Sequence, residues 1–566
     1  MTSSHPYASK PWLTAYPPDV PAEIGEVTQT LPQMLAESVR RHGRKTALEF
    51  FGATTTYRRL GRDIELAAEG LRRRGVGKGD RVAIVLPNCP QHVVAFYAVL
   101  RLGAIVVEHN PLYTARELRH QFEDHGARHA IVWDKVHDTV ADFPPDVRPD
   151  VIVSVDITAA LPLGKRLALR LPLAKAREAR AKLTARPTAR RVLGWETLIG
   201  GRGLRRRVPG PGLDDIALLQ YTSGTTGAPK GAMLTHRNLR ANAMQGEAWV
   251  PGLRTGAETF YAVLPLFHAY GMTLCLTFAM SIGARLVLFP AFDVGLVAEA
   301  ARKSPPTFLP AVPPIYDQLS RASAHGRLDL RSVRFAISGA MSLPVATVDR
   351  WEDASGGLLV EGYGMTETSP VALGNPMGPT RRPGTVGVPF PSTEIRIVDP
   401  DDAMKDLPSG AAGELLVRGP QVFSGYWRRA DETAAVLLAD GWLRTGDIAT
   451  VSPDGFVTIV DRLKELIITG GFNVSPTEVE QTLGSHPDVT AAAVVAVPRG
   501  DGGEAVAAAV VLREGADVDL DGLRDFCRVH LAAYKVPRRI VVMDDLPRSL
   551  IGKVLRREVR QRIIGG

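Results

Sequence analysis

Cysteine is scarce in this 566-residue chain, which contains only Cys89, Cys275 and Cys527. The three residues stand far apart, so they form neither a metal-binding nor a redox spacing, and a reducing cytosolic compartment is favoured. The first residues also lack the basic and apolar regions of a signal peptide. We therefore do not expect export.

A clear membrane span is also missing. Residues 259–284 contain no Asp, Glu, Lys or Arg and are long enough to cross a bilayer. However, the stretch includes Pro265, His268 and Gly271, and it opens with a strand-like run at 260–264. We interpret it as buried core.

Negative charge is scarce in one segment. Between Lys165 and Arg207 there are 14 Lys or Arg against Glu178 and Glu196, which gives this segment a net charge of +12. The whole chain has a net charge of +8, so the residues outside the segment sum to −4. Leucines alternate with the basic residues from 161 to 175, as in an amphipathic surface stretch. A solvated loop and an anionic membrane surface are both open interpretations of residues 165–207. Nucleic acid is not expected, because interleaved aromatics are missing apart from Trp195.

Hydrophobic content of 45% and charged content of 23% are typical of a soluble globular protein. From about residue 46 to 460, short apolar runs alternate with helix-length amphipathic stretches, which predicts a layered α/β fold. After Asp461 the pattern changes to a compact α+β unit. We predict an N-terminal domain over residues 1–461 and a C-terminal domain over 462–566. Predicted strands of the first domain include 82–86, 104–107, 130–133, 216–219, 285–289, 335–337 and 358–360; predicted helices of the second are 476–483, 523–531 and 554–563.

A segment rich in hydroxyls and glycines, YTSGTTGAPKG, extends from Tyr221 to Gly231. The glycines let an anion approach the backbone, the hydroxyls donate hydrogen bonds, and Lys230 adds a positive charge. It is not a Walker loop, because Pro229 precedes the lysine and a glycine follows it. The segment predicts a polyphosphate-binding loop, with a surface turn as the alternative.

Four further segments carry chemical groups in a suggestive order. EGYGMTET at 361–368 supplies an aromatic ring, a hydroxyl and a carboxylate, which suit base stacking, phosphate contact and Mg²⁺ ligation. DGWLRTGD at 440–447 ends in an aspartate that could accept both ribose hydroxyls. DRLKELIITGGFN occupies 461–473, and PRSLIGKVLR at 547–556 places Lys553 on a turn. Each segment alone is also compatible with an ordinary loop or turn.

Together and in this order, the five segments resemble the ANL superfamily of adenylate-forming enzymes, which includes acyl-CoA synthetases, luciferases and peptide-synthetase adenylation domains. The resemblance extends from about residue 30 to 560. Within the superfamily the chain looks most like the bacterial medium- and long-chain fatty acid-CoA ligases, through NPLYT at 110–114, GAMLTHRN at 231–238 and a basic insertion at about 160–208. The resemblance implies a large N-terminal layered α/β domain with a small mobile C-terminal α+β domain.

The resemblance also implies the reaction and its residues. A carboxylate attacks the α-phosphate of MgATP to give acyl-AMP and pyrophosphate, and the thiol of CoA then displaces AMP, so ATP, Mg²⁺ and CoA are expected. Lys553 would bridge the substrate carboxylate and the α-phosphate, Thr366 would reach the α-phosphate, and Asp447 with Arg462 nearby would bind ribose. Phosphate contacts are implied for Thr222, Ser223, Gly224, Thr225, Thr226 and Lys230, adenine contacts for Gly339, Ala340, Tyr363 and Gly364, and metal contacts for Glu367 and Thr226. Ala340 departs from the second glycine that many relatives carry.

By the same resemblance, Lys464 falls at a hinge. Rotation about it would remove Lys553 from the cleft and bring Gly470, Gly471 and Phe472 to the CoA path. The acyl site would lie near Phe267, His268 and Gly364, although a structural histidine in the core is a nearly equal alternative for His268. No Asp or Glu occurs from Thr259 to Phe292, so an uncharged acyl tail is favoured over an amino acid.

We therefore predict a fatty acid-CoA ligase that produces acyl-CoA, AMP and pyrophosphate. An aryl-acid CoA ligase and an acyl-AMP ligase that loads a carrier protein stay open as alternatives, because planar and aliphatic tails both require apolar walls. A catalytically silent nucleotide- or membrane-binding protein is a third hypothesis, which the presence of both Glu367 and Lys553 disfavours. The expected location is cytoplasmic, with peripheral attachment to the inner face of the cell membrane left open, and a homodimer is compatible with the resemblance.

Overall fold

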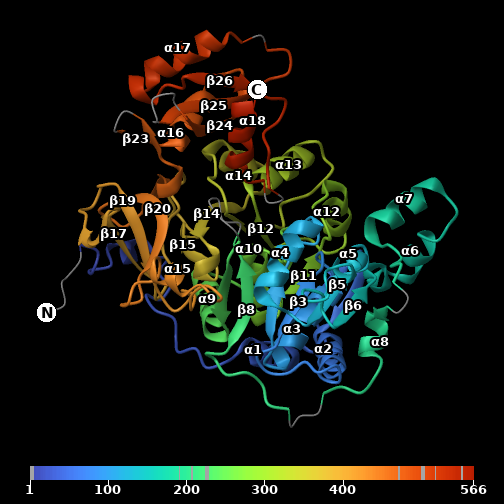
Figure 1. The fold of residues 1–566 in the computed structure, drawn as a ribbon. Helices are drawn as coiled ribbons and strands as arrows, with labels where there is room; N and C mark the ends of the chain where they lie inside the picture. The colour runs from blue at the N-terminus through green and yellow to red at the C-terminus, as the bar shows by residue number, and fades with distance from the viewer. Residues whose placement is uncertain are drawn as a thin grey trace. The chain divides into compact units, whose positions relative to one another are not determined.

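The computed structural model (Figure 1) describes residues 6–189, 192–204, 208–222, 229–469, 472–498, 504–516, 518–549 and 552–565. The chain divides into two compact units. The large unit consists of residues 15–393 and 418–441, and the small unit of residues 1–14, 394–417 and 442–566. The predicted domain division at 461/462 stays a prediction.

The first sheet of the large unit has seven strands, in the order β7-β6-β5-β3-β4-β8-β9. All neighbouring pairs are parallel except β8 and β9. The central strands are buried along nearly their whole length, as expected for a parallel sheet covered on both faces. The strands are β3 (Arg81–Val85), β4 (Ile105–Glu108), β5 (His129–Trp133), β6 (Val151–Val155), β7 (Leu193–Gly194), β8 (Ile216–Tyr221) and β9 (Gly231–Thr235).

The second sheet of the large unit has nine strands, in the order β16-β15-β14-β13-β12-β10-β11-β1-β2. Its middle is parallel, and antiparallel strands close both edges. Aromatic rings fill its core, where Phe260 stacks on Phe308 with ring centroids 4.2 Å apart. The strands are β1 (Thr46–Phe50), β2 (Ala53–Thr56), β10 (Thr259–Ala262), β11 (Arg285–Leu288), β12 (Phe308–Ala311), β13 (Phe335–Ser338), β14 (Leu358–Gly364), β15 (Val371–Gly374) and β16 (Val388–Pro389).

Helices connect and cover these strands. The largest contact between a helix and the 259–284 stretch is made by α9, which begins at a capping box between Thr235 and Asn238 and packs on the π-helix η3. The helices are α1 (Leu31–His42), α2 (Tyr57–Arg72), α3 (Pro90–Arg101), α4 (Ala115–His125), α5 (His137–Ala141), η2 (Ile157–Ala160), α6 (Leu163–Ala168), α7 (Ala174–Leu183), α8 (Trp195–Ile199), α9 (His236–Trp249), α10 (Ala269–Gly271), η3 (Met272–Phe278), α11 (Ala279–Ser281), α12 (Val294–Ala301), α13 (Pro313–Ala324), α14 (Val345–Ser355), η4 (Thr366–Thr368) and α15 (Ala430–Ala434).

The charge-free stretch 259–284 forms β10, α10, η3 and α11 and is largely buried. The prediction of buried core is therefore confirmed. Within the described part of the chain, none of the helices is both long and apolar enough to cross a membrane.

The small unit contains a five-stranded sheet, a two-stranded sheet and a three-stranded sheet. Side chains of the three-stranded sheet alternate between two cores: Val494 and Val506 face one, with Leu483 and Leu523, whereas Val495 faces the other. Its elements are η1 (Pro11–Ala15), β17 (Glu394–Asp399), β18 (Asp402–Asp406), β19 (Gly413–Arg418), β20 (Leu443–Val451), β21 (Val457–Arg462), η5 (Leu463–Glu465), β22 (Ile467–Thr469), β23 (Phe472–Val474), α16 (Pro476–Gly484), β24 (Val489–Pro498), β25 (Glu504–Leu512), α17 (Leu520–His530), η6 (Ala533–Lys535), β26 (Arg539–Val542) and α18 (Arg556–Gly565).

The predicted fold class is confirmed by this mixture of sheets and helices. Most predicted elements differ from the observed ones by one to three residues at their ends. Helix α17, for example, begins at Leu520 and not at the predicted Leu523, because the Asp519 carboxylate accepts hydrogen bonds from the amides of Asp521 and Gly522.

Candidate active site

The phosphate-loop segment of the large unit connects two paired strands. It follows β8, as predicted, and Tyr221 pairs with Gly231 at the start of the antiparallel β9. The Thr222 amide donates to the Lys230 carbonyl at 2.9 Å, which closes the two ends of the loop. The predicted phosphate contacts Ser223, Gly224, Thr225 and Thr226 lie outside the described residues.

Lys230 is held at the end of this loop by two neighbours. Its ammonium forms an ion pair with Glu432 of α15, and its Nζ lies 5.0 Å from the centroid of the Tyr426 ring. The lysine side chain is 32% exposed. The structure therefore places a partly accessible cation where the sequence predicts a phosphate contact.

Glu367 lies in the short helix η4 and is only 6% exposed. The Tyr426 hydroxyl donates to Glu367 Oε1 at 2.6 Å. Burial, together with the charge of Glu367, raises the pKa of Tyr426, so this hydroxyl keeps its proton and remains a donor. Thr366 directly precedes Glu367 in the chain, and the contacts predicted for both residues stay predictions.

The predicted adenine positions lie at the ends of two adjacent parallel strands. Gly339 and Ala340 follow β13, whereas Tyr363 and Gly364 end β14, and Ser338 is paired with Glu361 in the register. A Cβ atom on Gly339 would come within 3.2 Å of the Tyr270 ring, which explains the small residue there. Ala340 has a positive φ of 69°, a conformation that glycine adopts more easily. The strand pairing thus brings the four positions to one edge of the sheet.

An apolar pocket begins at the same edge of the sheet. Gly362, beside Tyr363, lines one part of it, and Trp249 and Phe390, whose rings stack at 4.6 Å, line another. Asn242, Gly246 and Trp249 face the pocket from α9 at the i, i+4, i+7 spacing of one helix face, and this face is about 10 Å long. Thr273, Leu274 and Phe278 of the π-helix contribute another wall. The walls of the pocket are thus mainly apolar.

Among the described residues that line this pocket, the one ionisable side chain is Glu361. Burial raises its pKa to about 8, and a hydrogen bond from the Leu343 amide offsets only part of this effect. Glu361 is therefore mainly neutral at pH 7. The pocket wall carries little charge, which agrees with the prediction of an uncharged acyl tail.

The three predicted acyl-site residues, Phe267, His268 and Gly364, are not among the described residues that line this pocket. The Phe267 carbonyl accepts from Gln220 Nε2 at 2.8 Å. His268 Nδ1 accepts from the Tyr270 amide at 3.3 Å and caps α10. Gly364 is exposed, and a Cβ there would lie 1.8 Å from the Pro370 carbonyl oxygen, so its close packing requires glycine. Their predicted acyl contacts stay predictions.

In the small unit, Asp447 and Arg462 are paired across β20 and β21, with 3.2 Å between Asp447 Oδ1 and Arg462 Nε. Lys553 lies in a turn where its backbone amide and carbonyl bond to Ser549. Burial, and next Arg462, lower the pKa of Lys553 to about 8, although Glu465 and Asp447 act in the opposite direction. The turn thus brings the predicted catalytic lysine into the electrostatic field of the predicted ribose pair.

The predicted hinge and CoA-path residues are only partly described. Lys464 is exposed on η5, next to Glu465, whose carboxylate lies 3.1 Å from Arg556 Nη1. Gly470 and Gly471 lie outside the described residues. Phe472 begins β23, and of its side chain nothing is described.

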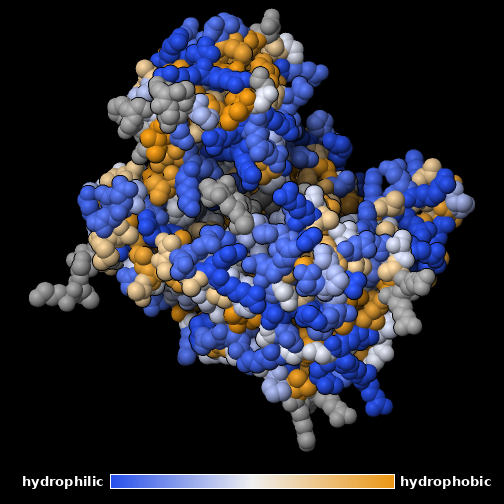
Figure 2. Space-filling model, viewed as in Figure 1, coloured by the Kyte–Doolittle hydropathy of each residue, from blue (hydrophilic) through white to orange (hydrophobic). Residues whose placement is uncertain are grey.

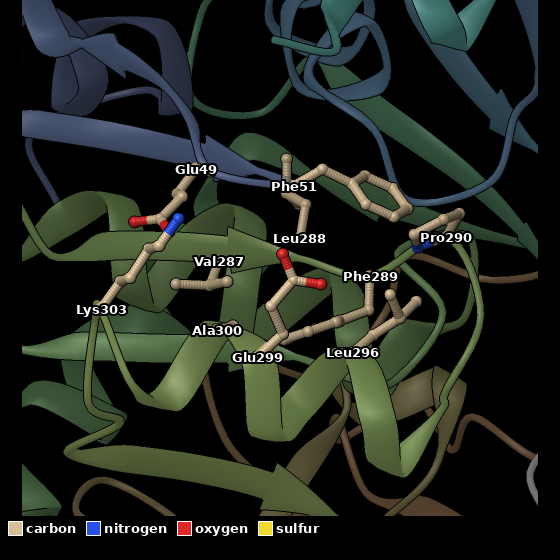
Figure 3. Close-up of a pocket in the computed structure, with 11 residues that line it drawn as sticks. Glu49, Phe51, Val287, Leu288, Phe289, Pro290, Leu296, Glu299, Ala300 and Lys303 are labelled. Atoms are coloured by element: carbon tan, nitrogen blue, oxygen red, sulfur yellow. The ribbon is translucent and has the colours of Figure 1, made fainter. Parts of the chain in front are cut away.

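A separate pocket lies between β1, β11 and α12. Figure 3 shows that the Glu299 side chain extends from α12 toward Leu288. Lys165 of α6 borders this region, since its Nζ lies 2.7 Å from Glu299 Oε1 and 5.5 Å from the centroid of the Phe51 ring. The described lining includes none of the predicted site residues. We therefore do not assign the reaction to this pocket.

Comparisons with known proteins agree with the motifs. A profile of AMP-binding enzymes matches residues 35–427, and a profile of the AMP-binding enzyme C-terminal domain matches residues 478–553. The chain belongs to the family of AMP-binding enzymes, and the predicted superfamily is confirmed.

Individual relatives cover nearly the whole chain. It is 38% identical over 557 residues to a long-chain-fatty-acid-CoA ligase of Bacillus subtilis (strain 168), with 98% of each chain covered. It is 36% identical over 518 residues to a feruloyl-CoA synthase of Amycolatopsis sp, covering 91% of this chain and 96% of the relative. The ATP-bound structure of MatB from Rhodopseudomonas palustris superimposes with a TM-score of 0.78 at 30% identity, covering 94% of this chain and 99% of MatB.

Proposed function

We propose that the protein is an ATP-dependent fatty acid-CoA ligase. The apolar pocket carries this conclusion, because it adjoins the strand ends that hold the predicted adenine positions and its one described ionisable side chain, Glu361, is mainly neutral. An acyl tail in this pocket would leave its carboxylate near Tyr363 and the predicted nucleotide site. The long-chain-fatty-acid-CoA ligase of Bacillus subtilis supports the same substrate class.

The reaction proceeds in two steps. In the first, a carboxylate oxygen forms a bond to the α-phosphorus of ATP, and the bond to pyrophosphate breaks. In the second, the thiolate of CoA attacks the acyl carbon, and AMP leaves with the electron pair of the broken C–O bond. The protein supplies no nucleophile, so its residues act by positioning and by stabilising charge.

Lys230 and the phosphate loop bind the β- and γ-phosphates, and Asp447 accepts hydrogen bonds from the ribose hydroxyls. Lys553 supplies a positive charge to the carboxylate and the α-phosphate, where negative charge develops. Its pKa of about 8 leaves it mostly protonated at pH 7, as this role requires. Lys464 serves as the hinge that allows Lys553 to leave before CoA reacts.

Glu367 fits a magnesium ion that arrives with ATP. Mg²⁺ prefers oxygen ligands and is usually bound by one or two carboxylates together with substrate phosphates. Within the described residues there is no group of three or more His, Cys, Asp or Glu that could hold a metal by itself. Glu367 would hold the ion together with ATP, with Thr226 as a further ligand. The bound ion would neutralise phosphate charge.

Purified protein with ATP, Mg²⁺, CoA and a panel of acids tests this function. We expect AMP and acyl-CoA with oleate or decanoate and little product with 4-coumarate. The opposite pattern would establish the aryl alternative. The 36% identity to a feruloyl-CoA synthase of Amycolatopsis sp is the reason to test this alternative. Pyrophosphate release without thioester formation would favour an acyl-AMP ligase that loads a carrier protein.

We also propose that α6, α7 and their connection, residues 163–183, bind an anionic membrane surface. Leu163, Leu167, Leu171 and Leu173 are 50–71% exposed, and the two fully described helices bury no residue. The segment carries seven Lys or Arg against Glu178. Figure 2 shows hydrophobic and hydrophilic residues side by side on this part of the molecule.

Contacts at both ends hold this segment to the large unit. Lys165 contacts Glu299 and Phe51, and Trp133 Nε1 donates to the Leu183 carbonyl at 2.9 Å. Leu167, Leu171 and Leu173 lie between these anchors and are exposed, so they can enter a lipid interface. Each basic residue near an anionic surface adds about 1 kcal/mol. Attachment at the inner face of the cell membrane follows from this proposal. A homodimer stays a prediction.

Vesicle sedimentation tests the membrane proposal. The protein should sediment with vesicles that contain anionic lipid at low salt, less at high salt, and little with neutral vesicles. Leu167→Ser with Leu171→Ser should weaken binding, whereas Leu112→Ser, at a position 63% exposed elsewhere, should not. Equal sedimentation of both variants would contradict the proposal.

A further inference from the structure

Residues 420–427, which we name the strap, connect two predicted nucleotide-binding elements of the large unit. The Trp427 amide donates to the Gly231 carbonyl at 2.8 Å, immediately after the phosphate loop. The Phe423 amide donates to the Glu367 carbonyl at 2.9 Å. The strap is thus hydrogen-bonded to β9 at one end and to η4 at the other.

Tyr426 of the strap contacts two side chains that are predicted to bind MgATP, Glu367 and Lys230. It is 8% exposed, its hydroxyl donates to Glu367 Oε1 at 2.6 Å, and its ring centroid lies 5.0 Å from Lys230 Nζ. Its amide donates to Thr433 Oγ1 at 2.9 Å, which fixes the backbone beside α15. One side chain therefore positions a carboxylate and a cation together.

Glu432 is a second neighbour of the lysine. It forms the ion pair with Lys230, and its side chain is 39% exposed, so it can turn into solvent when the pair breaks. Arg429 Nε lies 3.9 Å from Glu432 Oε1 and provides a second partner for it. The negative phosphates of ATP and the Glu432 carboxylate would compete for the same ammonium.

We propose that Tyr426 is a positioning residue that orients Glu367 toward the nucleotide-bound metal, and that Glu432 is a resting counter-ion which ATP displaces from Lys230. This inference rests on the proposed function, because it takes ATP as the ligand. A neutral hydroxyl can fix the orientation of a carboxylate without removing the negative charge that a divalent cation needs. A counter-ion keeps the lysine in place until the phosphates arrive.

Equilibrium binding of ATP without any acid substrate tests the role of Tyr426, since no turnover is required. Tyr426→Phe keeps the ring under Lys230 and removes only the hydroxyl. We expect ATP binding in EDTA to stay within about twofold, and the gain in affinity on adding Mg²⁺ to fall about tenfold, because hydrogen bonds to charged groups are among the stronger ones. Tyr261→Phe is the matched control, since it removes a buried hydroxyl that donates to the Ser304 carbonyl at 2.8 Å.

Glu432→Gln tests the counter-ion independently. Removing this charge should tighten ATP binding by roughly threefold or more, with and without Mg²⁺. The reason is that the Glu432 carboxylate then no longer pairs with Lys230 and no longer repels the phosphates. Asp431→Asn, on an exposed neighbour in α15, removes one charge without the contact to Lys230 and should change affinity less.

Each part of the inference has a result that would overturn it. A Tyr426→Phe protein with an unchanged response to Mg²⁺, or with equal losses in EDTA and Mg²⁺, would show that the hydroxyl does not act through the metal. Unchanged or weaker ATP binding by Glu432→Gln would show that no counter-ion is displaced. Failure of the proposed function would be seen separately, as wild-type protein that binds ATP but releases no pyrophosphate with any acid.

Discussion

Gly246 offers the sharpest test of where the acyl chain lies. It is the middle member of the α9 face that lines the apolar pocket, and a Cβ atom there would lie 3.4–3.6 Å from ring atoms of Phe278 on the opposite wall. These are ordinary van der Waals distances, so Gly246→Ala should fold. The added methyl group would narrow the pocket between α9 and the π-helix.

The size of the effect follows from burial. Each buried methylene contributes about 0.8 kcal/mol, which corresponds to roughly fourfold in kcat/KM. If the methyl group excludes two methylenes from the part of the pocket near Trp249, the longest acids lose about 1.6 kcal/mol, or more than tenfold. Acids too short to pass Gly246 should lose little. Alanine should also stabilise the helix by up to about 1 kcal/mol, so unfolding would not explain the loss.

The assay is acid-dependent pyrophosphate release with a series of saturated fatty acids at increasing chain length. Gly484→Ala is the control, because a Cβ at this exposed helical position would contact nothing within 4 Å. The wild-type and control profiles should coincide, and the Gly246→Ala profile should shift toward shorter acids. A uniform loss at every length, or an unchanged profile, would refute the assignment of this pocket to the acyl chain.

Three further predictions concern ionisable residues. Lys553→Ala should reduce acid-dependent pyrophosphate release by about a hundredfold or more, yet leave thioester formation from supplied acyl-AMP nearly unchanged; equal losses in both assays would contradict its restriction to the first step. Because the pKa of Lys553 is lowered to about 8, kcat/KM for ATP should fall as pH rises through 8, and Lys553→Arg should move this fall to higher pH. The pKa of Glu361 is raised to about 8 in the folded protein, from about 4.5 in the unfolded chain. Between these two pH values the folded protein binds one proton more than the unfolded chain, so the stability of the wild-type protein falls as pH rises through this range. Glu361→Gln should therefore show a Tm advantage over wild type that grows from pH 5 to pH 8, and a constant difference would be evidence against a buried neutral acid.

Local patterns predict the strands and motifs of this chain well. The run at 216–219 indicates a buried strand before the phosphate loop, and β8 lies there. The buried character of 259–284 also follows from its composition. These features depend on neighbouring residues, whose preferences the sequence shows directly.

Contacts between distant segments are harder to predict. Asn242, Gly246 and Trp249 have a recognisable helical spacing, but only the packing of α9 on the π-helix shows that this face borders a pocket. The residues around Tyr426 form no motif that predicts its role, and its hydroxyl donates to Glu367, which lies 59 residues earlier in the chain. Glu361 begins the EGYGMTET motif, but its raised pKa arises from burial, which several segments together create.

The central claim is best tested by the stoichiometry of products. With oleate or decanoate, ATP, Mg²⁺ and CoA, wild-type protein should form AMP, pyrophosphate and acyl-CoA in equal amounts, and omission of the acid should abolish all three. Formation of ADP and phosphate, or the absence of any acid-dependent product, would contradict the assignment as a fatty acid-CoA ligase.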